Sequence, residues 1–158
     1  MPPEPRIVLE QFLPYRLNVL ATVVSSALAQ IYSERFDLTI PGWRIVATLG
    51  QYGVRTARDI AFHAVMHKST VSRAVSALER RGLVARRPNR DDRREELLEL
   101  TPEGRRIYEA LVPEALAFED GLVSALAPAE QKAFLALVEK LDQRARALAP
   151  NVVAEAAS

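Results

Sequence analysis

Cysteine is absent from this chain of 158 residues. Its absence excludes disulfides, thiolate metal sites and redox sensing by a cysteine. Long apolar runs are also absent, since none approaches the roughly 20 residues that cross a bilayer. Residues 1–5 lack the basic and then apolar pattern of a signal peptide. We therefore expect a cytoplasmic protein without a membrane partner.

The sequence also lacks the usual signatures of an enzyme. It contains no glycine-rich phosphate loop and no nucleophile elbow. Carboxylates are plentiful in the last third of the chain, where we expect them on solvated helix surfaces rather than in a catalytic site. We predict that the protein is not an enzyme and that it needs no cofactor.

Charge is present in nearly equal amounts of both signs, but it is unevenly distributed. The net charge is +1, from 21 basic and 20 acidic residues. Residues 67–94 carry nine basic and three acidic residues, whereas residues 95–158 carry six basic and twelve acidic ones. The basic segment suggests a surface that faces a polyanion, although a solvated charged face would have the same composition.

Aromatic residues make up only 6% of a chain that is 49% hydrophobic, so Leu, Val and Ala must build the core, which favours helices. Apolar periodicity predicts four helices before Gly82. They span 13–36, about 42–53, a short segment that opens with Thr56 and Asp59 at capping-box spacing, and 67–81.

Beyond Gly82 the apolar period shortens to that of strands. Residues 83–87 and 97–100 predict a β-hairpin with a charged tip over 88–94. A short helix, a longer helix and a hairpin in succession form the layout of a winged helix, whose second helix enters the major groove of DNA.

Two long helices should follow the hairpin. The first starts at Thr101-Pro102, an N-cap followed by proline at the first helical position, and Pro113 should kink it. The second runs from near Pro128 to before Pro150, and residues 151–158 form a loose tail. The sequence contains no internal repeat, so we predict a mainly α (α+β) fold in a single domain over 1–158.

The predicted helix over 67–81 has a polar face that suits the major groove. This face carries small hydroxyl residues and arginines at spacings of three and four: Ser69, Ser72, Arg73, Ser76 and Arg80. Small residues let a helix sit deep in the groove, and one Arg can bind guanine with two hydrogen bonds. A plain solvated face is the alternative, but Ser has little to gain on an ordinary helix surface.

The hairpin tip mixes the two charge signs. Arg90, Arg93 and Arg94 stand beside Asp91 and Asp92, whereas a pure phosphate-binding patch would need no acid. We infer that the acids orient an arginine. Arginine suits a narrow minor groove because its guanidinium is weakly hydrated and is attracted by the negative potential there.

A metal site is not expected. His63 and His67 have the i, i+4 spacing of a zinc-binding helix, but Ala64 stands where a metalloprotease needs Glu. The two histidines should also lie on either side of the turn between two helices. We expect His67 instead to contact a phosphate at the edge of the groove.

Two linked motifs resemble the MarR family of bacterial transcription regulators. S-T-V-S-R over 69–73 with L-E-R-R-G-L-V over 78–84 is similar to the family's recognition helix and the start of its wing. D-R-R over 92–94 with L-T-P-E-G over 100–104 is similar to its wing and the start of its long dimerisation helix. One departure is His67, where an Asp, Ser or Thr would be a stronger cap.

The resemblance implies a winged helix-turn-helix with a two-stranded wing and a helical dimerisation region at both ends of the chain. The DNA-binding lobe would span 40–101 and the dimerisation lobe 10–36 with 102–149. Arg94 would enter the minor groove with Asp92 as its structural partner, and Arg73 and the serines would face the major groove. The predicted DNA-binding residues are Lys68, Ser69, Thr70, Ser72, Arg73, Ser76, Arg87, Arg90, Asp92, Arg93 and Arg94.

A second copy of the chain is the predicted partner. The apolar residues of the first helix and the last two exceed what one small winged helix can cover; they are Leu17, Leu20, Val24, Leu122, Leu126, Leu135, Leu137 and Leu141. An intrachain helical bundle is the alternative. A homodimer would bind an inverted-repeat operator in double-stranded DNA, most simply as a repressor.

A small-molecule effector is the last predicted partner. A cleft between the two lobes could contain Tyr15, Arg16, Trp43 and Arg44, whose rings could stack on an aromatic group and whose guanidinium groups could pair with an anion. Trp43 could equally be a core residue. The segments around these residues resemble a MarR subgroup that controls the breakdown of hydroxycinnamates and other aromatic acids, which implies an aromatic carboxylate or its coenzyme A thioester as effector.

A second class of function fits the same fold. A winged helix can serve as a protein-interaction module in a larger assembly, without binding DNA of its own. The nine basic residues over 67–94 argue against that alternative.

Overall fold

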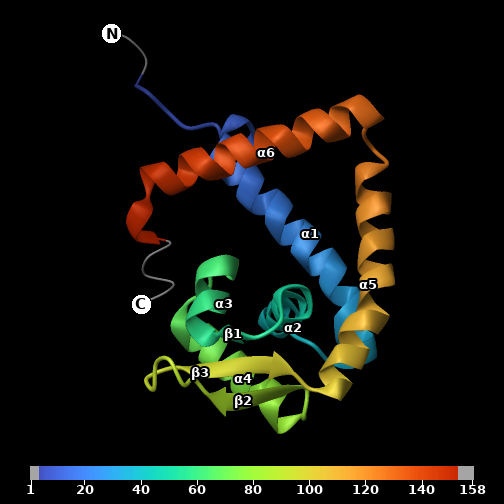
Figure 1. Cartoon of the computed structure of the whole chain (residues 1–158). Helices are drawn as coiled ribbons and strands as arrows, with labels where there is room; N and C mark the ends of the chain where they lie inside the picture. The colour runs from blue at the N-terminus through green and yellow to red at the C-terminus, as the bar shows by residue number, and fades with distance from the viewer. Residues whose placement is uncertain (1–3, 153–158) are drawn as a thin grey trace.

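The computed structural model describes residues 4–152 and places a small winged helix below an open frame of long helices (Figure 1). Its elements, in chain order, are η1 (Leu9–Gln11), α1 (Leu13–Phe36), α2 (Ile40–Tyr52), β1 (Arg55–Thr56), α3 (Ala57–Ala64), α4 (Lys68–Arg80), β2 (Val84–Pro88), β3 (Glu96–Leu100), α5 (Pro102–Val123) and α6 (Pro128–Leu148). The predicted order of helices and hairpin is confirmed.

Threonine side chains cap the N-termini of α3 and α5. Thr56 Oγ1 accepts a hydrogen bond from Asp59 N (3.1 Å), and Asp59 Oδ2 accepts one from Thr56 N (3.0 Å), so the predicted capping box is present at α3. Thr101 Oγ1 accepts from Gly104 N (3.0 Å) at the start of α5. These bonds satisfy amides that have no partner inside the helix.

The start of α4 differs from these, as the sequence predicts for His67. Among the described contacts, the His67 side chain caps no amide. Its backbone carbonyl instead accepts hydrogen bonds from Thr70 N (2.9 Å) and Val71 N (3.1 Å). The first turn of α4 is therefore closed by backbone hydrogen bonds, without a side-chain cap from His67.

The sheet has three antiparallel strands in the order β1-β3-β2. The predicted hairpin pairs Val84 with Leu100 and Pro88 with Glu96 at its two ends. The third strand, β1, was not predicted, because two residues are too few to show a strand period. Its pairing of Arg55 with Leu98 places the start of α3 beside the wing.

The core lies between α2, α3, α4, the sheet and the first half of α5, where Leu111 is its last buried residue. α1 reaches this core only near its C-terminus, since Tyr32 is its single buried residue. The Trp43 ring stacks on Tyr32 with 5.4 Å between centroids and 18° between planes. Trp43 therefore packs at the edge of the core, the alternative role that its sequence position left open.

The rest of α1 and all of α6 lie apart from this core. α6 crosses the far ends of α1 and α5, away from the winged helix (Figure 1). None of its 21 residues, all of them described, is buried. The leucines predicted to pack between helices are mostly exposed by 41% to 65%: Leu17, Leu20, Leu122, Leu135, Leu137 and Leu141. These exposed leucines contradict the alternative of an intrachain bundle.

The ends of the C-terminal helices follow the sequence closely. α5 continues through Pro113, so the proline does not end it. α6 ends at Leu148, before Pro150 as predicted, and a helical turn resumes at Pro150 after the non-helical Ala149. The predicted loose tail is therefore wrong for Asn151 and Val152, and its remainder, 153–158, lies outside the described residues. No helix within residues 4–152 is long and apolar enough to cross a membrane.

Candidate nucleic-acid interface

Helix α4 separates a buried apolar face from an exposed polar one. Val71, Val75 and Leu78 are buried and form the side that faces the core, where α4 packs on α2 and α3. Ser69, Ser72, Arg73 and Arg80 lie on the outer side and are exposed, as are Lys68 and His67. The helix thus presents the hydroxyl and guanidinium groups that a major-groove helix needs.

Ser76 differs from the other serines of this face. It is half-buried, and its Oγ accepts a hydrogen bond from Arg86 Nη2 at 3.2 Å. Thr70 is half-buried as well. The exposed part of the polar face is therefore concentrated at the N-terminal half of α4.

Arg86 connects the wing to α4 and was not among the predicted site residues. Its Nε bonds Glu79 Oε2 of α4 at 2.9 Å, and its Nη1 bonds Glu96 Oε2 of β3 at 2.9 Å. The hydrogen bond to Glu96 raises the pKa of the Arg86 guanidinium, partial burial opposes the rise, and the bond to Glu79 adds to it. The side chain stays cationic, and each of its three nitrogens donates a hydrogen bond to a protein partner.

Arg87 points to the other face of the hairpin. Its Nε lies 3.5 Å from Glu99 Oε2, and both side chains are about half exposed. An exposed pair of this kind contributes little and opens readily. The predicted phosphate contact of Arg87 remains compatible with this arrangement and stays a prediction.

The wing tip is held by side chains that accept hydrogen bonds from the backbone. Asp92 Oδ1 accepts from Arg94 N at 2.9 Å, and Asn89 Oδ1 accepts from Asp91 N at 3.0 Å. Asp92 thus orients Arg94 through its backbone amide. Arg90, Arg93 and Arg94 are exposed, so their guanidinium groups are available beyond the tip.

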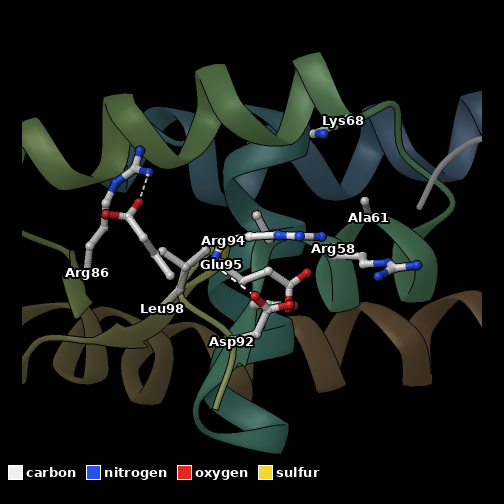
Figure 2. A pocket seen from close by; sticks show the side chains of 11 residues that line it. Arg58, Ala61, Lys68, Arg86, Asp92, Arg94, Glu95 and Leu98 are labelled. Atoms are coloured by element: carbon white, nitrogen blue, oxygen red, sulfur yellow. Dashed lines mark hydrogen bonds and ion pairs between the residues drawn. The ribbon is translucent and has the colours of Figure 1, made fainter. Parts of the chain in front are cut away.

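A cavity of about 590 Å³ lies between the wing, the start of α4 and the start of α3 (Figure 2). Arg94, Lys68 and Arg58 approach it from these three elements, and the Arg94 side chain extends toward α3. Asp92, Glu95 and Glu96 line it as well. The cavity therefore brings two predicted DNA-binding cations, Lys68 and Arg94, together with two that were not predicted, Arg58 and Arg86.

Arg58 was missed because nothing local marks it. A single arginine in the first turn of a short helix is common on any protein surface. It gains its position because β1 pairs with β3, which carries the first turn of α3 to the side of the wing. The only signal that could have found it is this long-range strand pairing.

The residues predicted to bind an effector are not gathered in one place. Arg44 is exposed and lines a hollow of about 310 Å³ between α1 and α2, together with Asn18, Thr22, Ser25 and Ser26. Tyr15 and Arg16 are exposed one turn earlier in α1 and are not among the described residues that line the hollow.

The charge of Arg44 also acts on the buried end of α1. Burial raises the pKa of the Tyr32 hydroxyl, and the charge of Arg44 opposes that rise.

Metal ligands do not cluster in the described part of the chain. Within residues 4–152, no group of three or more His, Cys, Asp or Glu residues is placed to hold a metal ion. The His63 ring instead contacts the Tyr52 ring edge-on, with 5.0 Å between centroids.

Comparisons with known proteins agree with this geometry. A family model described as MarR family matches residues 38–95, from the end of α1 to the wing. A Bacillus subtilis protein named as the uncharacterized HTH-type transcriptional regulator YwoH is 30% identical over 122 residues, which cover 77% of this chain and 88% of that protein.

Solved structures extend the similarity over the long helices. A MarR-family transcriptional regulator from Silicibacter pomeroyi is 31% identical with a TM-score of 0.73, over 85% of this chain and 90% of that one. Bordetella bronchiseptica BpsR, whose structure is described as the mechanism for regulation of its DNA binding by 6-hydroxynicotinic acid, is 24% identical with a TM-score of 0.77, over 87% and 98%. At that identity BpsR supports the fold alone. The chain belongs to the MarR family of winged-helix transcriptional regulators.

Proposed function

We propose that the protein is a homodimeric repressor that binds an inverted-repeat operator and is released by a small aromatic acid or its coenzyme A thioester. The observation that carries the DNA-binding part is the outer face of α4, where Ser69, Ser72 and Arg73 are exposed next to a wing with three exposed arginines. We keep the division into a DNA-binding lobe over 40–101 and a dimerisation lobe of 10–36 with 102–149.

The residues of α4 would contact the major groove. Arg73 is the candidate for bidentate binding of guanine, and Ser69 and Ser72 are short enough to let the helix approach the base edges. Lys68 and Thr70 in the first turn would bind backbone phosphate together with the amides there. Ser76 would contribute from the far end of the same face.

The wing would follow the backbone into the adjacent minor groove. Arg94 is the candidate for insertion, because Asp92 holds its backbone amide and its side chain is exposed. Arg87, Arg90 and Arg93 would bind phosphates on either side. We add Arg58 to the phosphate contacts, since it shares the cavity of Lys68 and Arg94.

A second copy of the chain would cover the exposed apolar faces of α1, α5 and α6. The chain exposes 11348 Å². A compact monomer of its mass would expose about 7,900 Å², so the excess is about 3,400 Å². Two copies together would carry about twice that excess, which is enough to supply the roughly 2,000–5,000 Å² or more that permanent interfaces bury in total over both partners. A two-fold axis through these helices would present one α4 to each half-site, with half-site centres about 34 Å apart.

The effector would bind between α1 and α2. The hollow there offers one guanidinium, Arg44, and the hydroxyl and amide groups of Thr22, Ser25 and Asn18, which suit a carboxylate and a ring hydroxyl. BpsR, which shares this fold, has its DNA binding regulated by an aromatic acid. Because α1 belongs to the proposed dimer surface, a ligand that prefers one position of α1 would change the spacing of the two α4 helices.

The test begins with DNA selection. The full chain is incubated with a randomised duplex library, and the enriched duplex is used in gel shifts in moderate salt and in sedimentation at micromolar protein. We expect an inverted repeat bound by one dimer. A monomer in sedimentation, or an absence of enrichment, would contradict the proposal and leave a protein-interaction module as the better account of the fold.

The effector is tested separately. We expect 4-hydroxycinnamate, its coenzyme A thioester or 6-hydroxynicotinate to raise the melting temperature of the protein, since a ligand stabilises the state it binds. The same compound should release the enriched duplex. Failure of all three compounds in both assays would refute the ligand class while leaving the DNA-binding part intact.

A further inference from the structure

Arg86 occupies the junction between the two parts of the proposed DNA surface. Its three guanidinium nitrogens reach Ser76 and Glu79 on α4 and Glu96 on β3, at 3.2, 2.9 and 2.9 Å. The guanidinium thus links the helix proposed for the major groove to the strand that follows the wing tip.

The chemistry of the link requires arginine. A planar guanidinium has five donors in a fixed fork, so it can bond three side chains in three directions at once. A lysine ammonium is a point charge on a flexible stem and could not hold the same three partners in one geometry. The Arg86 side chain is 29% exposed, whereas Glu79 and Glu96 are 43% and 57% exposed, so the link depends on three bonds made in one geometry rather than on burial.

The link acts close to the tip. Glu96 is the first residue of β3, two positions after Arg94. The tip itself is held by Asp92 through the Arg94 amide, within the loop. Without Arg86, the loop could keep its shape while the outer part of the hairpin moves against α4, because β1 pairs only with Leu97 and Leu98 and leaves two strands beyond them.

We propose that Arg86 is a positioning residue, which fixes the wing at one distance from α4 so that Arg73 and Arg94 meet adjacent grooves together. The inference rests on the proposed function, because it assigns a role within that DNA surface. Three of the Arg86 donors are directed to Ser76, Glu79 and Glu96, so the proposed role of Arg86 is to hold the wing rather than to bind a base. Its loss would change the preference of the protein for the flanking sequence that Arg94 contacts.

Two other roles for Arg86 make different predictions. A phosphate contact would strengthen binding to every duplex alike and would add about one counterion to the salt dependence. A purely structural role would change the melting temperature without changing which sequences are preferred. Positioning alone changes the preference for A·T-rich over G·C-rich flanks, because that preference depends on the insertion of Arg94 into a narrow minor groove.

The experiment is a double-mutant cycle between Arg86→Gln and Arg94→Ala. The full chain binds the enriched duplex with A·T-rich or G·C-rich flanks. We expect Arg86→Gln to lower affinity for the A·T-flanked duplex by about tenfold, which is within the usual range for residues of one network, and to remove most of the flank preference. On that background, Arg94→Ala should change affinity by less than about twofold, the error of additivity itself.

The matched control is Arg87→Gln on the same strand. Arg87 faces the opposite side of the hairpin, pairs with Glu99 and is a proposed phosphate contact, so its loss should weaken binding to both duplexes alike and leave the flank preference, the ratio of the two affinities, unchanged. Glu96→Gln provides a second test that keeps the arginine: it weakens one bond of the link and should reduce the flank preference in the same direction. Melting curves of all variants show whether each protein is folded, and the Glu96 variant decides the question if Arg86→Gln does not fold.

The outcomes separate the two levels of the proposal. If the unaltered chain enriches a duplex but the Arg86 and Arg94 effects add, or the Arg86 variant keeps its flank preference, the positioning role is wrong and DNA binding stands. If the unaltered chain enriches no duplex at all, the proposed function fails and the positioning role fails with it.

Discussion

Gly104 offers a sharp test of how the wing is attached to α5. It lies in the first turn of α5, and a Cβ built there would overlap the carbonyl oxygen of Leu83 and lie 3.0 Å from the carbonyl carbon. The obstacle is backbone, so no side-chain rotation can remove it. Leu83 directly precedes β2, and its carbonyl also accepts a hydrogen bond from Thr101 N at 3.1 Å.

Two effects of opposite sign meet in the substitution Gly104→Ala. Alanine is the better helix former by about 0.8–1 kcal/mol. Forcing one extra methyl group into a packed site costs typically about 1–3 kcal/mol, and a backbone obstacle places the cost at the upper end. The cost of the clash exceeds the gain in helix propensity, so we expect Gly104→Ala to lower the free energy of unfolding by about 1–2 kcal/mol. This corresponds to a fall of about 2–8 °C in melting temperature for a chain of this length.

Gly121 is the matched control on the same helix. A Cβ at Gly121 meets no described atom within 4 Å. Gly121→Ala should therefore raise the melting temperature by a few degrees or leave it unchanged, because only the propensity term acts. Both variants and the unaltered chain are compared at one protomer concentration, since the melting temperature of a dimer depends on it.

The two glycine variants also separate stability from DNA binding. Displacing Leu83 shifts the base of β2, so Gly104→Ala should weaken binding of the enriched duplex even well below its melting temperature. If the two alanine variants melt alike, or Gly104→Ala melts above the unaltered chain, the close approach of α5 to Leu83 is not present in the protein and the reasoning is refuted.

The remaining predictions concern the three proposed surfaces. Arg73→Ala should cost about 1–3 kcal/mol on the enriched duplex and relax base preference at one position, as measured by competition with single-base variants. Arg58→Ala should weaken specific and nonspecific binding alike and lower the salt slope by about one, and an unchanged slope in salt titrations would exclude a phosphate contact. Leu137→Glu should shift the sedimenting species toward monomer, because a two-fold interface loses about 1.5–3 kcal/mol twice. Arg44→Ala should abolish the thermal shift produced by an aromatic carboxylate while leaving DNA affinity in its absence unchanged; retained ligand binding would remove Arg44 from the site.

What the sequence could predict was local. The capping box of Thr56 and Asp59 depends on residues three apart, and the two faces of α4 depend on a period of 3.6, so both follow from nearest neighbours along the helix. The hairpin follows from a change of period and a charged tip. These features fix the order of elements, which is most of the fold.

What the sequence could not predict was the pairing of distant segments. β1 is too short to have a pattern, yet it carries Arg58 to the wing. Trp43 had two plausible roles, and only the approach of Tyr32 from α1 decided between them. Neither contact produces a periodic pattern in the sequence. Each joins two segments that are far apart in the chain, and the loops between them set their spacing.

The two arginines of β2 show the same limit at the level of single residues. Alternation along a strand says that Arg86 and Arg87 point to opposite faces, but it does not say which of them faces α4. The register decides: Arg86 lies opposite the buried Leu98, and Arg87 lies opposite Leu97. A slip of one residue in the hairpin would exchange the two faces. The charged tip over 88–94 fits more than one register, so the sequence could not show that Arg86, rather than its predicted neighbour Arg87, joins the wing to α4.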